Sequence, residues 1–171
     1  MKKSLLIVLI LLNISKFGFA QKEKVEAMYI YQFTKLVDWC PAYKTGDFVI
    51  GVVGTTPVYN ELQALAGKPV ANQKIVIKKY ETIAEMDRCN ILFIPADKSK
   101  VLTEANRKIK KNCTLVVTEK NGLILNGAAV NFIETSGKVV FEMNKTILEE
   151  HSLKVNNKLY AMAKTVYQSE D

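Results

Sequence analysis

The residues with the widest range of chemistry in this sequence are three cysteines and one histidine: Cys40, Cys89, Cys113 and His151. Zinc is usually held by clustered Cys and His ligands, often in Cys-x-x-Cys pairs. This sequence has no such pair, and its single histidine directly follows two glutamates. We therefore predict no metal site, and we expect His151 to lie at a solvated helix end.

Disulfide chemistry is the second possibility for the cysteines. An odd count permits at most one intramolecular bridge. Cys89 lies just before the apolar run 91–94, and Cys113 lies just before the apolar run 115–117. If these runs are neighbouring parallel strands, both cysteines lie at one end of the sheet, where their Cα separation suits a bridge. The sequence favours a Cys89–Cys113 disulfide with Cys40 free. Three reduced thiols, packed as small apolar groups, are the alternative.

The sequence carries no recognisable catalytic constellation. It has no Gly-x-Ser-x-Gly motif, and no serine has an evident basic partner. Cys40 and His151 would be needed for a thiol–imidazole pair, but Cys40 lies beside Trp39 and is better explained as a packed thiol. The glycine-containing turn at 51–56 lacks the third glycine of the dinucleotide fingerprint and the Lys-Ser or Lys-Thr of a P-loop. We predict no catalytic residue, no cofactor and no enzymatic activity.

Hydrophobic periodicity predicts the elements that must position these residues. Helical spacing predicts four segments: Val25–Trp39, a helix opening at Thr56-Pro57 and ending at Gly67, Val101–Ile109, and Asn156–Tyr167. Short apolar runs predict strands at Phe48–Val53, Ile75–Ile77, Asn90–Ile94 and Thr114–Thr118. Ser136-Gly137 joins Val130–Thr135 to Lys138–Met143 as a β-hairpin, and Ile83–Asp87 is expected to be a short helix or turn.

Alternation of strands and helices places the chain in the α/β class. It predicts a mostly parallel sheet with helices on both faces, a Rossmann-like sandwich. The hairpin near the C-terminus adds an antiparallel edge to this sheet. The sequence shows no internal repeat, low-complexity tract or linker, so residues 21–171 are expected to form one domain.

Residues 1–20 have the layout of a cleaved secretory signal peptide. A basic start, Met1-Lys2-Lys3, precedes an apolar run from Leu5 to Ile14, and Gly18-Phe19-Ala20 provides small residues before the expected cleavage site at Gln21. An uncleaved anchor is the alternative, but the run is short for a membrane span. No later stretch is apolar and long enough to cross a membrane, so we expect an exported, soluble product.

The charge distribution argues against nucleic acid as a partner. The formal net charge of +7 falls to +4 once the three lysines of residues 1–20 are removed. The remaining lysines are interspersed with acids, which is typical of a solvated surface rather than of a nucleic-acid patch. Attraction to anionic lipid headgroups is expected to be modest.

One segment identifies a family. The helix Val25–Trp39 closely resembles the opening signature of the YfiR-like family of bacterial periplasmic proteins, in which an aromatic-x-Phe-x-Lys segment precedes an acidic residue and Trp. Here those residues are Tyr31, Phe33, Lys35, Asp38 and Trp39. Three further blocks resemble the family in the right order: Val49–Gly54 leading to Leu65–Lys68, Cys89–Ile94, and Ala129–Ile133 through Val140–Asn144 to Leu153–Leu159. Cys40 departs from the pattern, because family members commonly place Pro directly after the Trp.

The resemblance implies a periplasmic location, and regulation rather than catalysis. Family members are similar to a periplasmic inhibitor that binds the outer-facing domain of an inner-membrane diguanylate cyclase, which lowers cyclic-di-GMP production and biofilm formation. They form homodimers on a Rossmann-like sandwich that binds no dinucleotide, disulfides support the folded repressor, and histidine kinases are a second class of membrane partner. On this basis the candidate partner-binding residues are Tyr31, Lys35 and Trp39 of the predicted first helix.

A rival hypothesis follows from the fold class alone. Open α/β sheets place ligands outside the carboxyl ends of their parallel strands. A periplasmic small-molecule binding protein would then use the strand-end turns Gly54-Thr55-Thr56 and Pro95-Ala96-Asp97.

Overall fold

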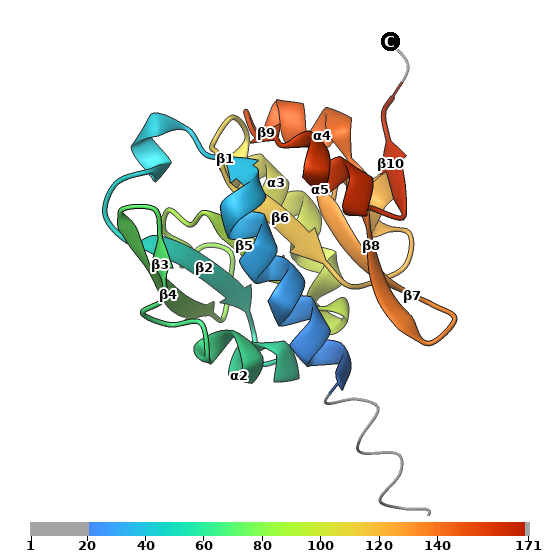
Figure 1. The fold of residues 1–171 in the computed structure, drawn as a ribbon, viewed down its shortest axis with the longest axis horizontal. Coiled ribbons are helices and arrows are strands. Elements are labelled where there is room, and N and C mark those ends of the chain that lie inside the picture. Colours follow the sequence, from blue (N-terminus) through green and yellow to red (C-terminus); the bar gives the residue numbers. More distant parts are fainter. Residues whose placement is uncertain (1–20, 170–171) are drawn as a thin grey trace, which may run out of the picture.

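A computed structural model describes residues 21–169, which form an eight-stranded mixed sheet with helices packed on it (Figure 1). The helical segments are a helix over residues 21–36, termed here the N-terminal helix, then η1 Pro41–Tyr43, α2 Pro57–Gln63, η2 Ala96–Val101, α3 Leu102–Ile109, η3 Leu123–Asn126, α4 Lys145–Glu150 and α5 Asn157–Met162. The strands are β1 Val37–Asp38, β2 Phe48–Val53, β3 Pro69–Val70, β4 Gln73–Tyr80, β5 Ile91–Ile94, β6 Leu115–Thr118, β7 Val130–Thr135, β8 Lys138–Asn144, β9 Lys154–Val155 and β10 Thr165–Tyr167.

The strand order in the large sheet is β10-β8-β7-β6-β5-β2-β4-β3. The β7–β6–β5–β2–β4 stretch is parallel, whereas β8 pairs with β7, and β3 with β4, in antiparallel fashion. The sheet is therefore mixed, and the predicted mostly parallel, Rossmann-like arrangement is not confirmed. The physical reason is that short turns join β3 to β4 and β7 to β8, which return the chain beside itself in the opposite direction. Strand β10, at the outer edge, is parallel to β8.

Successive residues of the central strands face two separate cores. Ile50, Phe93 and Val117 belong to the core under the N-terminal helix, α2, α4 and α5, whereas Leu92 and Val116 belong to a second core under α3. This alternation follows from the two-residue period of a strand. Because both faces are covered, the strands read in the sequence as continuous apolar runs.

The N-terminal helix crosses one face of the sheet diagonally (Figure 1). It buries Ala27, Ile30 and Phe33 on its inner stripe. The Phe33 ring lies 6.1 Å from Phe132 and 5.2 Å from Phe141, centroid to centroid, so it packs against aromatic rings from both strands of the hairpin. The helix ends at residue 36, three residues earlier than predicted, because the next two residues form β1 and pair with β9.

The predicted β-hairpin is confirmed. Strands β7 and β8 pair in register from Val130↔Met143 to Thr135↔Lys138. The two turn residues, Ser136 and Gly137, both have positive φ values of 52° and 71°, as a tight two-residue connection requires. The hairpin does not form the edge of the sheet, however, because β10 pairs with β8 on its outer side.

The C-terminal helix is shorter than predicted. It ends at Met162, and residues 165–167 then form β10, parallel to β8. The β-branched and aromatic residues Thr165, Val166 and Tyr167 suit a strand, and the free edge of β8 supplies their hydrogen bonds. The segment Ile83–Asp87 contains turns. The sequence predicted a helix end at His151 but no range for that helix, which is α4. The Asn144 side chain caps α4 by accepting from the Ile147 N–H at 3.2 Å.

The signal-peptide prediction concerns residues 1–20, which lie outside the described residues. Within residues 21–169, no helix combines the length and the hydropathy needed to cross a membrane.

Candidate partner-binding surface

Two of the three candidate contact residues lie on the outer side of the N-terminal helix. The Lys35 ammonium lies 4.1 Å from the centroid of the Tyr31 ring, and the Lys68 ammonium lies 5.4 Å from the same centroid. Tyr31 is half-buried and Lys35 is exposed. Two cations over one aromatic ring hold the ring in place and leave a local positive potential on this side of the helix.

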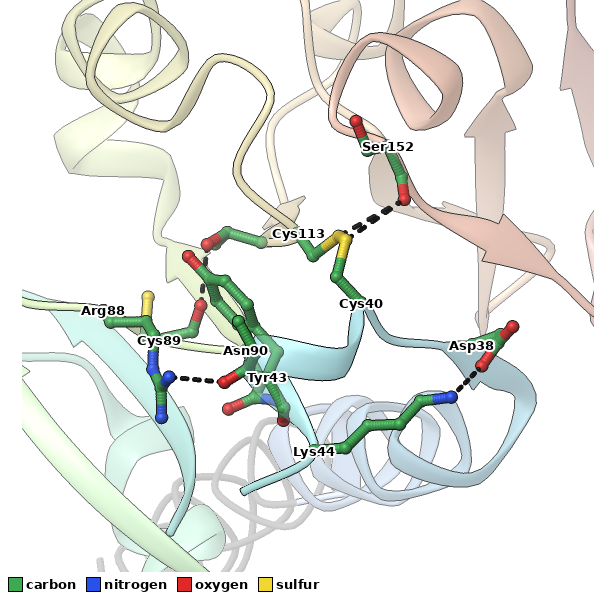
Figure 2. The surroundings of a disulfide bond; sticks show 11 residues. Asp38, Cys40, Tyr43, Lys44, Arg88, Cys89, Asn90, Cys113 and Ser152 are labelled. Carbon is green, nitrogen blue, oxygen red and sulfur yellow. Dashed lines mark hydrogen bonds and ion pairs between the residues drawn. A yellow bond between two sulfur atoms is a disulfide. The ribbon is translucent and has the colours of Figure 1, made fainter. Parts of the chain in front are cut away.

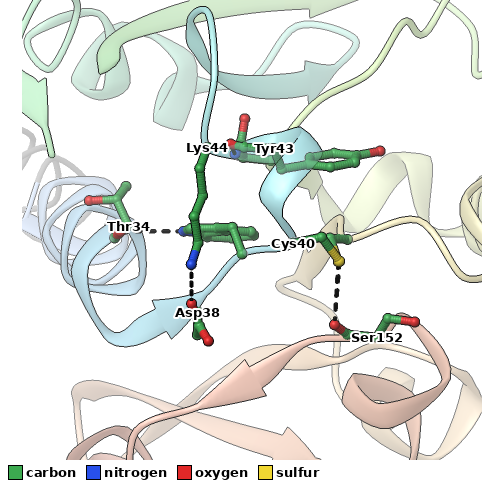
Figure 3. A network of polar contacts seen from close by, with 9 residues as sticks. Thr34, Asp38, Cys40, Tyr43, Lys44 and Ser152 are labelled. Atoms are coloured by element: carbon green, nitrogen blue, oxygen red, sulfur yellow. Dashed lines mark hydrogen bonds and ion pairs between the residues drawn. A yellow bond between two sulfur atoms is a disulfide. The ribbon is translucent and has the colours of Figure 1, made fainter. Parts of the chain in front are cut away.

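The third candidate, Trp39, lies in the core. Its side chain is 5% exposed, and its indole ring packs edge-on against Phe48 with 5.2 Å between centroids. The indole N–H points toward the Thr34 carbonyl oxygen at 3.5 Å (Figure 3). Trp39 is therefore unavailable to a partner and serves to seat the end of the N-terminal helix.

The disulfide joins Cys40 to Cys113, and the predicted Cys89–Cys113 pairing is wrong. The Cα atoms of Cys40 and Cys113 lie 5.9 Å apart, within the range that a bridge requires. The Ser152 carbonyl oxygen lies 3.3 Å from the Cys113 sulfur and 3.7 Å from the Cys40 sulfur (Figure 2). The bridge thus fastens the segment after the N-terminal helix to the amino end of β6, next to the turn that follows α4.

Cys89 is the free cysteine, and it faces the opposite core. Its side chain is 1% exposed and packs with the second core under α3, whereas Cys113 belongs to the first. The two strands do begin at the same end of the sheet, as predicted, but the two thiols lie on different sides of it. Burial raises the pKa of Cys89 to about 12, so this thiol stays protonated and unreactive at neutral pH.

The other end of the N-terminal helix carries a group of buried and partly buried ionisable side chains, which we call the carboxylate cluster: Glu23, Glu26 and Glu119 with Lys22. The Lys22 ammonium lies 2.8 Å from a Glu119 oxygen and 3.5 Å from a Glu26 oxygen. The second Glu119 oxygen accepts the Ala96 N–H at 3.2 Å. Since Ala96 follows β5 and Glu119 follows β6, the cluster lies at the carboxyl ends of these two parallel strands.

Glu26 is the most strongly perturbed member of this cluster. Glu26 is 0% exposed, and neither of its carboxyl oxygens accepts a hydrogen bond from the described residues. Burial, and then the nearby Glu119 carboxylate, raise the pKa of Glu26 to about 8. Glu26 is thus a neutral carboxylic acid near pH 7. The sequence held a signal for this group, because Glu26 shares one helical stripe with the apolar residues Ile30 and Phe33.

The strand-end turns of the rival hypothesis lie side by side, since β2 and β5 pair in parallel. At the first turn, Gly54 has φ +71°, and a Cβ built on it would lie 2.6 Å from the Lys98 Cε. The Lys98 side chain therefore lies directly against this glycine. Thr56 and Pro95 are buried. These contacts pack the turns against their own neighbours and give the ligand-binding hypothesis no positive support.

An apolar groove runs along the N-terminal helix, between this helix and α5. Its volume is about 370 Å³, and its lining residues are Val25, Met28, Tyr29, Gln32 and Leu36 from the N-terminal helix with Lys158 and Met162 from α5. The sequence analysis missed this groove because it depends on how two helices from opposite ends of the chain meet. Its only sequence signal was the helical spacing of the five lining residues on the N-terminal helix.

Metal and nucleophile chemistry find no support in the described part of the chain. Residues 21–169 contain no group of three or more His, Cys, Asp or Glu side chains placed to hold a metal ion. His151 is 2% exposed at the end of α4, not solvated as predicted, and burial lowers its pKa. Cys40 is bonded to Cys113, so it is not available as a thiol partner for His151.

Comparison with known protein families gives a match over most of the chain. The profile of the YfiR/HmsC-like family matches residues 23–164. A solved structure, a conserved domain protein of Vibrio cholerae O1 biovar El Tor, is similar to this chain at 15% identity with a TM-score of 0.49. That similarity covers 70% of this chain and 55% of the other, so this chain spans about half of its length. Comparison with curated proteins yields no match. The match over most of the chain shows that this protein belongs to the YfiR/HmsC-like family.

Proposed function

We propose that this protein is a periplasmic regulator that binds the outer-facing part of an inner-membrane signalling enzyme of the diguanylate cyclase type and represses its output. Family membership over residues 23–164 carries the proposal, because the YfiR/HmsC-like family suggests a periplasmic regulator of such a cyclase. The absence, among residues 21–169, of any group of side chains placed to hold a metal ion is compatible with a regulator. A histidine kinase is the second class of membrane partner that the family resemblance implies.

Repression by binding has a definite physical requirement. A regulator shifts a two-state receptor only if it binds one state more tightly than the other. The outer side of the N-terminal helix supplies suitable groups, since the Lys35 and Lys68 ammonium groups both lie close to the Tyr31 ring. An ordered aromatic ring with fixed charges beside it gives a contact that depends on the partner's geometry.

The direct test is crosslinking in living cells. The tagged protein is expressed from its full-length sequence, crosslinked, and purified with the membrane fraction, and the captured proteins are identified by mass spectrometry. The proposal predicts capture of an inner-membrane enzyme with a periplasmic domain, and a rise in cellular cyclic-di-GMP when the gene for this protein is deleted. Recovery of its own copies alone would contradict the proposal.

Charge reversal at Lys35 tests the contact. Lys35→Glu is expected to weaken binding to the captured enzyme by about threefold or more, because the positive potential beside Tyr31 is lost. Lys110→Glu is the matched control, since this exposed lysine ends α3 on the opposite face of the sheet. Circular dichroism melts check that both variants fold. Equal binding by the two variants would remove Lys35 from the contact.

The predicted homodimer is part of the proposal and stays a prediction. Light scattering coupled to size exclusion measures the mass of the purified protein directly. A monomer at micromolar concentration would contradict the dimer while leaving partner binding to be judged by the crosslinking experiment.

A further inference from the structure

The groove between the N-terminal helix and α5 exposes apolar side chains that a lone domain has no need to expose. Met28 is 60% exposed and Met162 is 37% exposed, and both line the groove. They are two of the four large hydrophobic residues exposed in the described part of the chain; the others, Leu125 and Val166, do not line it. Two exposed methionines facing one hollow are more informative than scattered apolar residues, because methionine adapts its shape to a bound surface.

The residues that line the groove are regularly spaced along the two helices. Its five residues on the N-terminal helix follow the spacing i, i+3, i+4, i+7 and i+11, which is one continuous helical stripe. This stripe is about 17 Å long at 1.5 Å per residue, or about three helical turns. Lys158 and Met162 are four residues apart and form the facing side on α5. A trough between two helices is the shape that receives a third helix through its apolar face.

The charges along this trough have one sign. Lys158 lines the groove itself, and Lys24 and Lys35 are exposed on the same helical stripe as Met28, one turn before it and two turns after it. None of the seven lining residues is acidic. A bound helix therefore gains most if its own flanks carry Glu or Asp. A second copy of this chain would bring the same lysines against themselves, which is unfavourable.

We propose that this groove is the docking site for an amphipathic helix with an apolar stripe and acidic flanks, belonging to the receptor's outer-facing domain. This inference rests on the proposed function and adds the site and the chemistry of the partner segment. Met28 and Met162 contact the apolar stripe, and Lys158, Lys24 and Lys35 pair with the acidic flanks. The Tyr31 and Lys35 contact then forms one rim of a single interface.

The test uses two synthetic helical peptides of fifteen residues, each labelled with fluorescein, that share one Leu stripe. One has Glu on its flanks and the other has Lys, and fluorescence anisotropy measures their binding to the purified protein. The acidic peptide is expected to bind more tightly, with an affinity that falls as salt is raised. Met28→Glu and Met162→Glu should each weaken its binding about tenfold or more. Lys158→Glu should reduce the preference for the acidic peptide.

Leu125→Glu is the matched control, because Leu125 is an exposed apolar residue on η3, outside the groove. It should leave binding unchanged. Met28→Gln, which adds no charge, separates loss of apolar contact from charge repulsion and should still weaken binding. Thermal melts confirm that each variant is folded, as expected for exposed positions.

Several results would overturn the inference. Two concern the peptides: equal binding of both, or a loss of binding in Leu125→Glu as large as in Met28→Glu. Two point to another occupant. In one, neither peptide binds, but phosphatidylglycerol vesicles bind and Met28→Glu abolishes that binding; in the other, the protein is a dimer that dissociates in Met28→Glu. Failure of the groove is distinguishable from failure of the function. Capture of the membrane enzyme in cells, undiminished by Met28→Glu, would remove the groove from the interface and leave the regulator proposal intact.

Discussion

The two ends of the N-terminal helix are fastened to the sheet by different chemistry. At its C-terminal end, the Cys40–Cys113 bridge, the buried Trp39 ring and the pairing of β1 with β9 hold the chain. The Asn156 N–H adds a 3.0 Å hydrogen bond to the Leu36 carbonyl. At its N-terminal end, the contacts include buried carboxyl groups around one lysine. The attachment of the C-terminal end depends on the redox state of the disulfide, and that of the N-terminal end depends on the protonation of buried carboxyl groups.

This difference matters because the exposed face of the helix lies between the two ends. Tyr31, Lys35 and the groove are positioned only while the helix stays seated on the sheet. A covalent clamp is insensitive to pH, whereas a buried acid is stabilising only in its neutral form. We expect the end that carries the carboxylate cluster to loosen first as pH rises, and the disulfide end to loosen first under reducing conditions.

Removing the disulfide is expected to have the largest effect. The bridge closes a loop with a sequence separation of 73 residues. The chain-entropy treatment assigns such a loop about 4 kcal/mol of stability. Cys40→Ser/Cys113→Ser should lower the free energy of unfolding by about this amount in urea titrations, and the double variant should no longer respond to dithiothreitol.

Cys89→Ala provides the control for this prediction. It removes a buried thiol on the opposite face, should cost only about 1 kcal/mol through the small cavity it leaves, and should keep the response to dithiothreitol. A wild-type protein whose unfolding midpoint is unchanged by reductant would show that the bridge does not clamp this end.

The pairing of these cysteines shows where sequence reasoning stops. Strands β2, β5 and β6 and the hairpin were predictable, because apolar runs and a Ser-Gly turn dictate them locally. The partner of Cys113 was not, because it depends on the path of the chain after Trp39. Sequence placed Cys89 and Cys113 at one end of the sheet, but the face on which each thiol lies depends on tertiary packing.

The same limit explains the errors at the C-terminus and in the candidate site. Leu159, Met162 and Val166 have helical spacing, yet the edge of β8 draws the last of them into β10. Trp39 matched a family signature, but the signature does not say whether its ring faces Phe48 or solvent. The groove could not be predicted at all, because α5 had first to be placed against the N-terminal helix.

Rising pH tests the other end of the helix. The pKa of Glu26 is about 8 in the folded protein and near its ordinary value of 4.5 when unfolded. Between these values the folded state holds the extra proton, so stability falls as pH rises, by roughly 1.4 kcal/mol for each pH unit at most. We expect a loss of about 2 kcal/mol between pH 6 and pH 8. Glu26→Gln should remove this slope in urea titrations.

Glu104→Gln is a suitable control for this experiment, because Glu104 is an exposed carboxylate on α3. It should keep the wild-type slope. If the slope persisted unchanged in Glu26→Gln, the pH dependence would have to originate outside the carboxylate cluster, and the contrast between the two ends would lose its basis.

Removing the Lys22 charge sharpens the comparison between the two ends of the N-terminal helix. Lys22 is the only cation within ion-pair distance of Glu26 and Glu119 among the described residues. Lys22→Gln should destabilise the protein by about 1 kcal/mol at pH 7, since the pair is only partly buried. It should also raise the pKa of Glu26 further, because the Lys22 charge opposes that rise. Lys24→Gln, on the exposed side of the same turn, is the control and should change neither quantity.

The smallest expected effect concerns the disulfide end at acid pH. His151 directly precedes Ser152, whose carbonyl contacts both bridge sulfurs. Its ring is 2% exposed, burial lowers its pKa below 6.5, and its Nδ1 has no hydrogen-bond partner among the described residues. A depressed histidine pKa gives stability that is present above pH 6.5 and lost as pH falls through the folded value. Wild-type protein should therefore lose a little stability below pH 6, and His151→Gln should lose less, measured by urea titration at pH 5 and pH 7. An equal loss in the two proteins would show that the disulfide end is indifferent to pH over this whole range, and only the carboxylate cluster would then respond to protons.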